Sequence, residues 1–418
     1  MAGQEPVDTL AVLWGLQGFR VAYVEVRDKG GGKHVKVIGL EDRRREHVCP
    51  CGKRHGEGVQ ETEPRRWRDC SLGDYVTFVE IAPFRVACCG GTRVEVFPWE
   101  ALGHRTTRRF FERVAALCTR LTVNAVAKMF GMSWDTIARI DKEAIELALG
   151  GKAPSLDGLR FIGVDEVSRT GGHQYFTMVT DLDSGRVVWV AEGKRSEALE
   201  QFFEQLGKRG CRRIRIVVSD LGGSYLPVIA KYVPHARHVL DRFHIVQWLN
   251  KALNELRRRV FGGAPRDEVG RALKLKKWML LRAYEALEHR HKLLLARLVS
   301  VNRPLYKAYL LKEQLRGILH HPWLYLGALV RNLKDWCSAA IRSRIPEMAA
   351  VGRRLRPHLD KVVAGFNSGV KLGLVEAING KVDLLRRTAR GFRLPEYFKL
   401  KIFQRCSLPD NPWADVVL

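Results

Sequence analysis

Residues 161–193, FIGVDEVSRTGGHQYFTMVTDLDSGRVVWVAEG, decide the fold class of this chain. Three apolar runs rich in Val, Ile, Phe and Tyr follow one another here, and turn-forming Gly, Asp and Ser separate them. Such runs predict three strands in a meander. A helical pattern at 197–207 comes next, followed by two further strand-like runs at 213–220 and 236–241. A meander, a helix and two more strands predict a mixed α/β sheet.

Downstream of this sheet the pattern becomes helical. Residues 242–361 carry apolar side chains at helical spacing and no run that is typical of a strand. They hold 26 Lys and Arg against 9 Asp and Glu, so they carry most of the formal charge of +26 in this 418-residue chain. A helical bundle needs less charge for solubility, so the excess favours contact with nucleic-acid phosphates.

Upstream of the sheet the sequence predicts two smaller units. Residues 10–40 and 72–98 alternate apolar and polar side chains in short runs, which is typical of a small β-rich unit. From Thr106 the apolar spacing becomes helical, and the Gly-rich segment 150–154 follows as a predicted linker.

Cysteines are the first group of possible metal ligands. The nine Cys are odd in number and unevenly spaced, which favours a reducing compartment with one local cluster. The β-rich unit contains two close thiol pairs, Cys49 with Cys51 and Cys88 with Cys89. Four thiolates are typical of a structural Zn²⁺ site.

The spacing of these thiols departs from the usual Cys-x-x-Cys pattern, so the ligand set stays open. His47, His55 and Cys70 are possible substitutes for one of the four thiols. The alternative interpretation is a group of buried free thiols without metal. We favour zinc, because the four Cys lie close to Gly and Pro in a charged segment.

Residues 123–140 fit a helix-turn-helix, with Gly131 at the turn and the small Ala127 where the two helices would cross. The apolar positions between the helices are Val126, Phe130, Met132, Ile137 and Ile140. The second helix would present Trp134, Asp135, Thr136, Arg139 and Lys142 outward. An ordinary helix pair explains the apolar spacing but not the alanine and glycine together, so DNA binding is favoured.

Acidic residues at strand ends form the second group of possible metal ligands. Asp165 lies near the end of one predicted strand and Asp220 ends another, and adjacent strands would bring the two side by side. A divalent cation relieves the repulsion between such carboxylates. Other acids lie equally close to strand ends, namely Glu166, Asp181, Asp183, Glu192 and Asp241.

Several ordered motifs resemble the insertion-sequence L three (ISL3) family of bacterial DDE transposases. They are GVDEVSRTGGHQYFTMVTDLDSGRVVWVAEG, VVSDLGGSY, DRFHIVQWLN, AYLLKEQLRGIL and EAINGKVDLLRRTARGF. They occur in the family's order. Together with the Cys cluster and the helix-turn-helix, they cover nearly the whole chain.

The resemblance implies a ribonuclease-H-like catalytic core whose acidic triad is Asp165, Asp220 and Glu376. The triad would hold Mg²⁺ or Mn²⁺, and an all-helical domain would be inserted before the glutamate. Ala377 follows Glu376 where the family usually has Gly. Asp241 and His244 resemble the acid-x-x-His motif of insertion-bearing transposases. His244 would contact the scissile phosphate or cap the helix that follows.

The expected fold is therefore multidomain α+β. The expected domains are a zinc-binding β-rich unit (1–100), a helix-turn-helix (101–150), a ribonuclease-H-like core (155–241 and 366–418) and a basic helical insertion (242–365). The expected function is a transposase, acting as a homo-oligomer, expected to be a dimer on DNA, that binds the terminal inverted repeats of its element, cuts the DNA and joins it to target DNA.

A nuclease of the same core that does not join DNA, and a DNA-binding repressor derived from a transposase, are the two alternatives. No run of 18 or more apolar residues is present, and acids occupy the N-terminal stretch where a signal peptide has basic and apolar residues. We therefore expect a cytoplasmic protein without a membrane partner.

Overall fold

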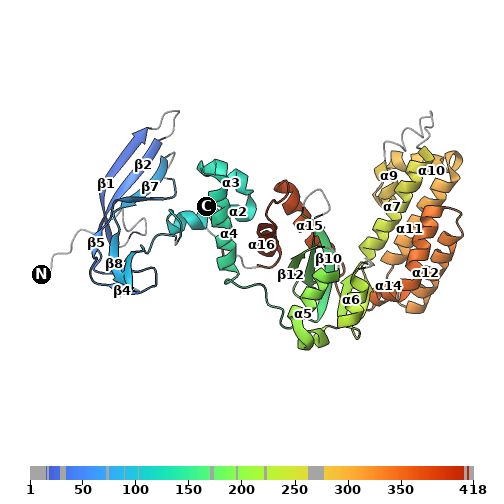
Figure 1. Ribbon diagram of the computed structural model, residues 1–418. Helices are drawn as coiled ribbons and strands as arrows, with labels where there is room; N and C mark the ends of the chain where they lie inside the picture. The colour runs from blue at the N-terminus through green and yellow to red at the C-terminus, as the bar shows by residue number, and fades with distance from the viewer. Residues whose placement is uncertain are drawn as a thin grey trace. The chain divides into compact units, whose positions relative to one another are not determined.

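The structure is a computed structural model (Figure 1). It describes residues 16, 18–28, 34–71, 75–88, 90–101, 103–169, 174–193, 196–220, 224–261, 277–408 and 412–413. The chain divides into two compact units, residues 1–152 with 408–418 and residues 153–407. The sequence analysis assigns residues 408–418 to the last segment of the catalytic core (366–418). In the structure they belong to the first unit. In that unit, Trp413 Nε1 donates to the Ala144 carbonyl at 2.9 Å.

The first unit begins with small antiparallel and mixed sheets. Its largest sheet has the order β1-β2-β7-β6 and consists of β1 (Phe19–Asp28), β2 (His34–Asp42), β7 (Tyr75–Ile81) and β6 (Arg65–Arg68). The smaller sheets contain β3 (His47–Val48), β4 (Arg54–His55), β5 (Gln60–Glu61), β8 (Phe84–Cys88) and β9 (Gly91–Val94). Aromatic side chains, including Trp67, Phe97 and Trp99, form much of the buried core.

Three helices follow in the first unit: α2 (Arg108–Arg120), α3 (Val123–Phe130) and α4 (Trp134–Ala148). Each begins at a hydroxyl residue whose side chain accepts a hydrogen bond from the backbone of the first turn, namely Thr107, Thr122 and Ser133. Such N-caps satisfy backbone donors that a helix start leaves without partners. The three helices are therefore delimited by local sequence signals.

The second unit is built on a five-stranded sheet of order β12-β11-β10-β13-β14. Its strands are β10 (Phe161–Ser168), β11 (Tyr175–Asp181), β12 (Arg186–Glu192), β13 (Ile216–Ser219) and β14 (Arg237–Leu240). The first three form the predicted antiparallel meander, and β13 and β14 run parallel to β10. The mixed α/β sheet expected from the sequence is present.

Two helices connect the strands of this sheet. Helix α5 (Ser196–Arg213) bends at Gly207, whose backbone is not helical, and α6 (Tyr225–Tyr232) lies between β13 and β14. The sequence pattern predicts no helix between these two strands, so α6 is a difference from the expectation. Helix α6 has only eight residues and includes Val228, Ile229 and Pro227, so its periodicity is too short to recognise. Proline is tolerated there because the first turn lacks intrahelical acceptors for its N–H groups.

Between β14 and residue 367 the described residues form helices and no strand, as the periodicity predicts. The helices are α7 (Arg242–Phe261), α9 (Lys277–Leu281), α10 (His289–Val301), α11 (Arg303–His320), α12 (Leu326–Ile341), α13 (Pro346–Leu355) and α14 (Leu359–Phe366), with short 3-10 turns at Tyr284–Ala286 and Arg356–His358. They share one large apolar core. Among the described helices, none combines the length and apolar character needed to cross a membrane.

The chain then returns to the sheet through α15 (Gly373–Thr388) and α16 (Pro395–Cys406). Figure 1 shows α15 beside β10. Val375 of α15 is buried with Val218 of β13 and Val239 of β14 in one apolar cluster. This contact brings a segment more than 200 residues downstream of β10 against the middle of the sheet.

Candidate catalytic site and DNA-binding surface

Three aspartates lie near the carboxyl ends of adjacent parallel strands: Asp165 three residues before the end of β10, and Asp220 and Asp241 directly after β13 and β14. The pairing of β10 with β13 reaches Gly163 and Val218, and the same register continued for two residues would place Asp165 opposite Asp220. Ser219 pairs with Leu240 of β14, so the next position places Asp220 opposite Asp241. The backbone N–H of Asp241 donates to the Ser219 carbonyl at 3.2 Å, consistent with that continuation.

Helix α15 brings Glu376 to the same end of the sheet as the three aspartates. Asp165, Asp220, Asp241 and Glu376 together are called the acidic strand edge below. A side chain added at Gly163 would meet Val375 Cγ2 at 2.6 Å, so the glycine permits the helix to approach β10 closely. One turn further along α15, Asn379 Nδ2 donates a hydrogen bond to Asp165 Oδ2. Glu376 is exposed and lies between these two contacts on α15.

Asp165 is held by two hydrogen bonds and lies beside a histidine. Its Oδ1 accepts a hydrogen bond from the backbone N–H of Glu166 at 2.7 Å, and its Oδ2 accepts from Asn379. His244 Nε2 of α7 lies 3.6 Å from Oδ2, and both side chains are largely buried. Although burial alone would lower it, the carboxylates of Asp165, Asp241 and Asp220 raise the pKa of His244 to about 9.

Asp241 is buried beside the other acids. Burial raises the pKa of its carboxyl, and the negative charges of Asp165 and Glu376 add to this rise. Asp241 Oδ1 accepts a hydrogen bond from the backbone N–H of Phe243 at 2.9 Å, in the first turn of α7. Asp241 therefore caps the helix that follows, which was one of the two roles considered for His244.

The arrangement concentrates negative charge on hard oxygen atoms. Asp165, Asp220, Asp241 and Glu376 all act electrostatically on His244 or on one another. Carboxylate oxygens are the ligands that Mg²⁺ and Mn²⁺ prefer, and a bound cation would relieve the repulsion between neighbouring carboxylates. The type of donor therefore suits a divalent metal, whereas no three of these described carboxylates have oxygen atoms within 4.8 Å of one another.

Sequence reasoning missed two residues that organise this edge. Asn379 was quoted only within a motif, although its spacing of three from Glu376 places both on one helical face. Arg169, just after β10, donates from Nη1 to the Phe392 and Arg393 carbonyls at 3.1 and 2.7 Å. Arg169 thereby ties the loop after α15 to the sheet. The Glu376-x-x-Asn379 spacing was a usable signal, whereas nothing local in the sequence indicated the role of Arg169.

The helix-turn-helix of the first unit has the predicted geometry. Gly131 ends α3 in the left-handed conformation (φ 62°, ψ 33°), where a residue without a side chain is favoured. Val126, Ala127, Ile137 and Ile140 are buried between the helices. Trp134, Arg139 and Lys142 are exposed on α4.

Thr136 is half-buried and therefore less exposed than the other three residues. Its hydroxyl lies 2.8 Å from that of Ser133, the N-cap of α4. Lys142 Nζ lies 3.9 Å from Glu146 Oε1, one turn further along the same helix. Of the four predicted DNA-contacting residues, three are therefore well exposed and Thr136 is engaged with the helix cap.

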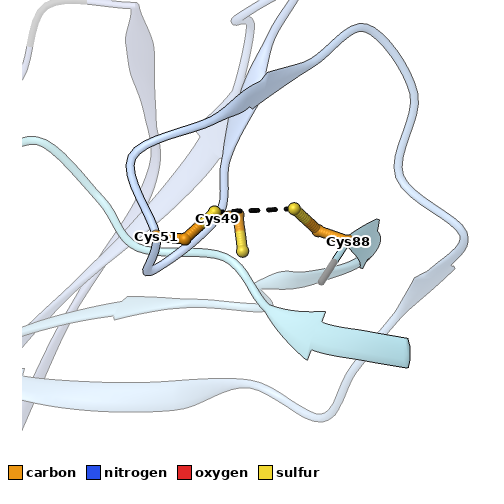
Figure 2. A group of neighbouring side chains, drawn as sticks. All are labelled: Cys49, Cys51 and Cys88. Atoms are coloured by element: carbon orange, nitrogen blue, oxygen red, sulfur yellow. Dashed lines mark hydrogen bonds between the residues drawn. The ribbon is translucent and has the colours of Figure 1, made fainter. Parts of the chain in front are cut away.

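Three of the four predicted zinc ligands lie together in the first unit. Cys49, Cys51 and Cys88 have their sulfur atoms within 4.8 Å of one another, and Cys51 Sγ lies 3.5 Å from Cys88 Sγ (Figure 2). A tetrahedral zinc site places its sulfurs about 3.8 Å apart. Cys89 lies outside the described residues.

Two backbone hydrogen bonds fold the chain around Cys49 into a tight turn. The N–H of Cys49 donates to the Lys53 carbonyl, and the N–H of Gly52 donates to the Cys49 carbonyl, both at 2.8 Å. Of the substitutes considered, none of His47, His55 and Cys70 belongs to the group of three thiols. His47 Nδ1 instead lies 3.0 Å from Glu95 Oε2.

A second group of metal-type ligands, Asp42, His47 and Glu95, also lies within 4.8 Å. Here the Arg44 guanidinium donates to Asp42 Oδ2 and to Glu95 Oε2, each at 2.6 Å. Phe84 N–H donates to the other oxygen of Glu95 at 2.8 Å. An arginine already compensates the carboxylates, so this group is a structural ion network.

Aromatic residues of the helical domain divide between core and surface. Trp336 is buried and donates from Nε1 to the Leu311 carbonyl at 2.8 Å, so it is a core residue. Trp278 is 62% exposed. In the basic run 257–259, Arg257 is buried, whereas the exposed Arg259 is bound to Glu347 by two hydrogen bonds.

The region of the acidic strand edge and the helix-turn-helix both resemble parts of known proteins. Residues 162–402 match the DDE transposase family of the ISL3 type, and residues 95–145 match the helix-turn-helix domain of ISL3 transposases. The chain is 30% identical over 406 residues to a transposase for insertion sequence element IS1001 of Bordetella parapertussis, covering 96% of this chain and 97% of that protein. It is 31% identical over 405 residues to a transposase for IS1557 of Mycobacterium tuberculosis, covering 89% of each.

Proposed function

Because the chain belongs to the ISL3 family of transposases, which are DNA-binding DDE enzymes, we propose that it binds the terminal inverted repeats of its own insertion sequence. It then hydrolyses a phosphodiester at each end of the element and joins the freed 3′-hydroxyl to target DNA. The observation that carries this proposal is the acidic strand edge. We assign the role of metal ligands to Asp165, Asp220 and Glu376. Register, the Gly163 contact and the Asn379 hydrogen bond support this set.

Mg²⁺ is the proposed ion, with Mn²⁺ as a substitute, because the donors are hard oxygens. When bound by these carboxylates, two such ions would supply charge stabilisation for the attacking and leaving oxygens of an in-line displacement at phosphorus. The protein's part is to hold the carboxylates on rigid elements, two at strand ends and one on a helix. His244 is proposed to contact the scissile phosphate, because Asp241 already caps α7.

The sheet supports a ribonuclease-H-like assignment. Three antiparallel strands followed by two strands parallel to the first, in the order β12-β11-β10-β13-β14, are the arrangement expected for that core. The helices between β14 and α15 then correspond to the inserted domain. Their basic excess supports a role in binding DNA phosphates.

In the first unit we propose that α4 reads the element end. Trp134, Arg139 and Lys142 are exposed on it, and Thr136 lies at its first turn. The repeats at the two ends of an element favour a dimer on DNA, since matched sites recruit matched subunits. We propose that Zn²⁺ binds Cys49, Cys51, Cys88 and Cys89 and holds the preceding β-rich region together.

One assay tests the function against its two alternatives. Purified protein with Mg²⁺ is incubated with a labelled element end and a supercoiled target. Cut and joined products are expected; cutting without joining would identify a nuclease, and binding without cutting a repressor. Asp220→Asn and Glu376→Gln should lose both products by several orders of magnitude while still binding the element end.

Asp183→Asn is the matched control, because Asp183 is an exposed acid in the turn between β11 and β12 and pairs with Arg160 at 3.2 Å. It should cut and join like the wild type. Near-normal joining by Glu376→Gln would overturn the assignment of the third carboxylate.

A further inference from the structure

Asn379 makes a contact that the triad alone does not explain. It lies on α15 three residues after Glu376, and its Nδ2 donates to the Oδ2 of Asp165, more than 200 residues upstream. The other oxygen of Asp165 is already held by the Glu166 N–H at 2.7 Å. Asn379 therefore completes a pair of donors that fixes the rotation of this carboxylate about its Cβ–Cγ bond.

The oxygen of the Asn379 amide shows that this orientation costs folding free energy. Its Oδ1 is buried and accepts no hydrogen bond from the described residues. A buried acceptor without a hydrogen bond has lost its water and gained no partner, which costs folding free energy. Turning the amide over would not remove the cost, because Oδ1 would then face the negatively charged Oδ2 of Asp165. The hydrogen bond to Asp165 thus decides how the amide lies.

Packing alone does not account for an asparagine at this position. The neighbours on the inner face of α15, Val375 and Ile378, are apolar and buried, and they attach the helix to the sheet. A further apolar residue would continue that contact without leaving an acceptor unsatisfied. The amide instead connects the helix that carries Glu376 to the carboxylate of Asp165.

We propose that Asn379 is a positioning residue for the transposition reaction. It orients the Asp165 carboxylate for the divalent metal and couples that orientation to the placement of Glu376 on the same face of α15. The inference rests on the proposed function, because it requires Asp165 and Glu376 to be metal ligands. Partners that orient metal ligands typically contribute 10–100-fold in metal affinity or activity.

The test measures metal binding as well as reaction. Mn²⁺ affinity of the full-length protein is determined by titration calorimetry, and melting temperature is recorded in metal-free buffer. Asn379→Ala should weaken Mn²⁺ binding about 10–100-fold, with a smaller fractional loss of cleavage at saturating Mn²⁺. Unchanged Mn²⁺ affinity would overturn the proposal, because a purely structural latch would alter only the melting temperature.

Asn332→Ala is the matched control, because Asn332 also lies on a helix but its Nδ2 donates to the Ala328 carbonyl at 2.9 Å. It should leave Mn²⁺ affinity unchanged. If Asn379→Ala does not fold, Asn379→Asp preserves the side-chain shape and replaces the donor by an acceptor. Loss of cleavage by Asn379→Asp in excess metal is then expected, and wild-type cleavage would contradict the proposal.

Failure of this inference is distinguishable from failure of the proposed function. If Glu376→Gln abolishes cleavage and Asn379→Ala binds Mn²⁺ like the wild type, only the role of Asn379 is wrong. If Glu376→Gln cleaves and joins normally, the metal-ligand assignment itself is wrong.

Discussion

Two regions of the molecule gather acids around a histidine, and they differ in what neutralises the charge. In the first unit, Glu95 is fully buried and is bound by the Arg44 guanidinium, the His47 ring and a backbone N–H. At the strand edge of the second unit, Asp165 accepts hydrogen bonds from an amide and a backbone N–H, with His244 at 3.6 Å.

The comparison separates a structural ion network from a site suited to a cation. The same side-chain types occur in both, so composition of the cluster does not decide its role. An arginine inside the cluster satisfies the carboxylates in the folded protein. The amide of Asn379 and the backbone N–H of Glu166 orient Asp165 without cancelling its charge. The neighbouring carboxylates raise the pKa of His244 to about 9, so this imidazole is a cation at neutral pH, but one cation offsets only part of the charge of the four acids.

The largest expected effect concerns the strand edge. Asp165→Asn keeps the acceptor for the Glu166 N–H but removes one charge from the metal site. We expect cleavage to fall by at least about 10³-fold. The rise in melting temperature that Mn²⁺ produces in the wild type should disappear, because that rise measures metal bound to the folded state. A full Mn²⁺ shift in Asp165→Asn would remove the distinction between the two clusters.

The next effect concerns the network of the first unit. Arg44→Met leaves Glu95 buried without its guanidinium, which should destabilise that unit by about 3–5 kcal/mol in chemical denaturation. Divalent metal should not restore the loss. Arg54→Met is the control, because Arg54 pairs with Glu46 at 3.2 Å on the surface, where such pairs contribute about 0–1 kcal/mol. Equal losses in the two variants would contradict the structural role.

A smaller effect is expected where α15 meets β10. Gly163→Ala forces a methyl group against Val375, so α15 must shift together with Glu376. We expect a loss of stability of about 1–3 kcal/mol from overpacking, and a loss of cleavage of up to about 10²-fold from the displaced carboxylate. Adding Val375→Ala should recover part of the cleavage. Gly317→Ala, where the added methyl meets nothing within 4 Å, should cleave normally.

The smallest effect is a pH-dependent gain in stability of the metal-free protein. The pKa of Asp241 is raised by burial and by its acidic neighbours, so ionised Asp241 costs folding free energy. This cost is absent below the ordinary aspartate pKa of about 3.9 and is complete above the raised pKa. Asp241→Asn should therefore melt slightly higher than the wild type at neutral pH, and the difference should vanish towards pH 3. A constant difference at all pH values would attribute it to packing.

Much of the fold could be predicted because its signals are local. The meander at 161–193, the helix-turn-helix turn at Gly131 and the helical stretch after β14 follow from side-chain periodicity and from one glycine conformation. Helix α6 was missed because eight residues give too little periodicity. The ISL3 membership predicted from ordered motifs is confirmed by the family matches.

The site was only partly accessible to the same reasoning. The sequence indicates that Asp165 lies near the end of one strand and that Asp220 ends another, but five other acids satisfied the same description. Resemblance selected Glu376. The structure adds that Asp241 continues the row and that Asn379 contacts Asp165, since these depend on strand register and on helix placement.

The sequence by itself determined where the strands of the meander and most of the long helices lie, and that two aspartates stand at or near strand ends. These properties depend on neighbours within a few residues. Tertiary structure alone decided that β13 lies beside β10, that α15 crosses β10 at Gly163, and that Arg44 reaches Glu95. These contacts join residues 51 to more than 200 positions apart. They arise from packing of whole elements, and local periodicity carries no information about which distant segment will cover a given face.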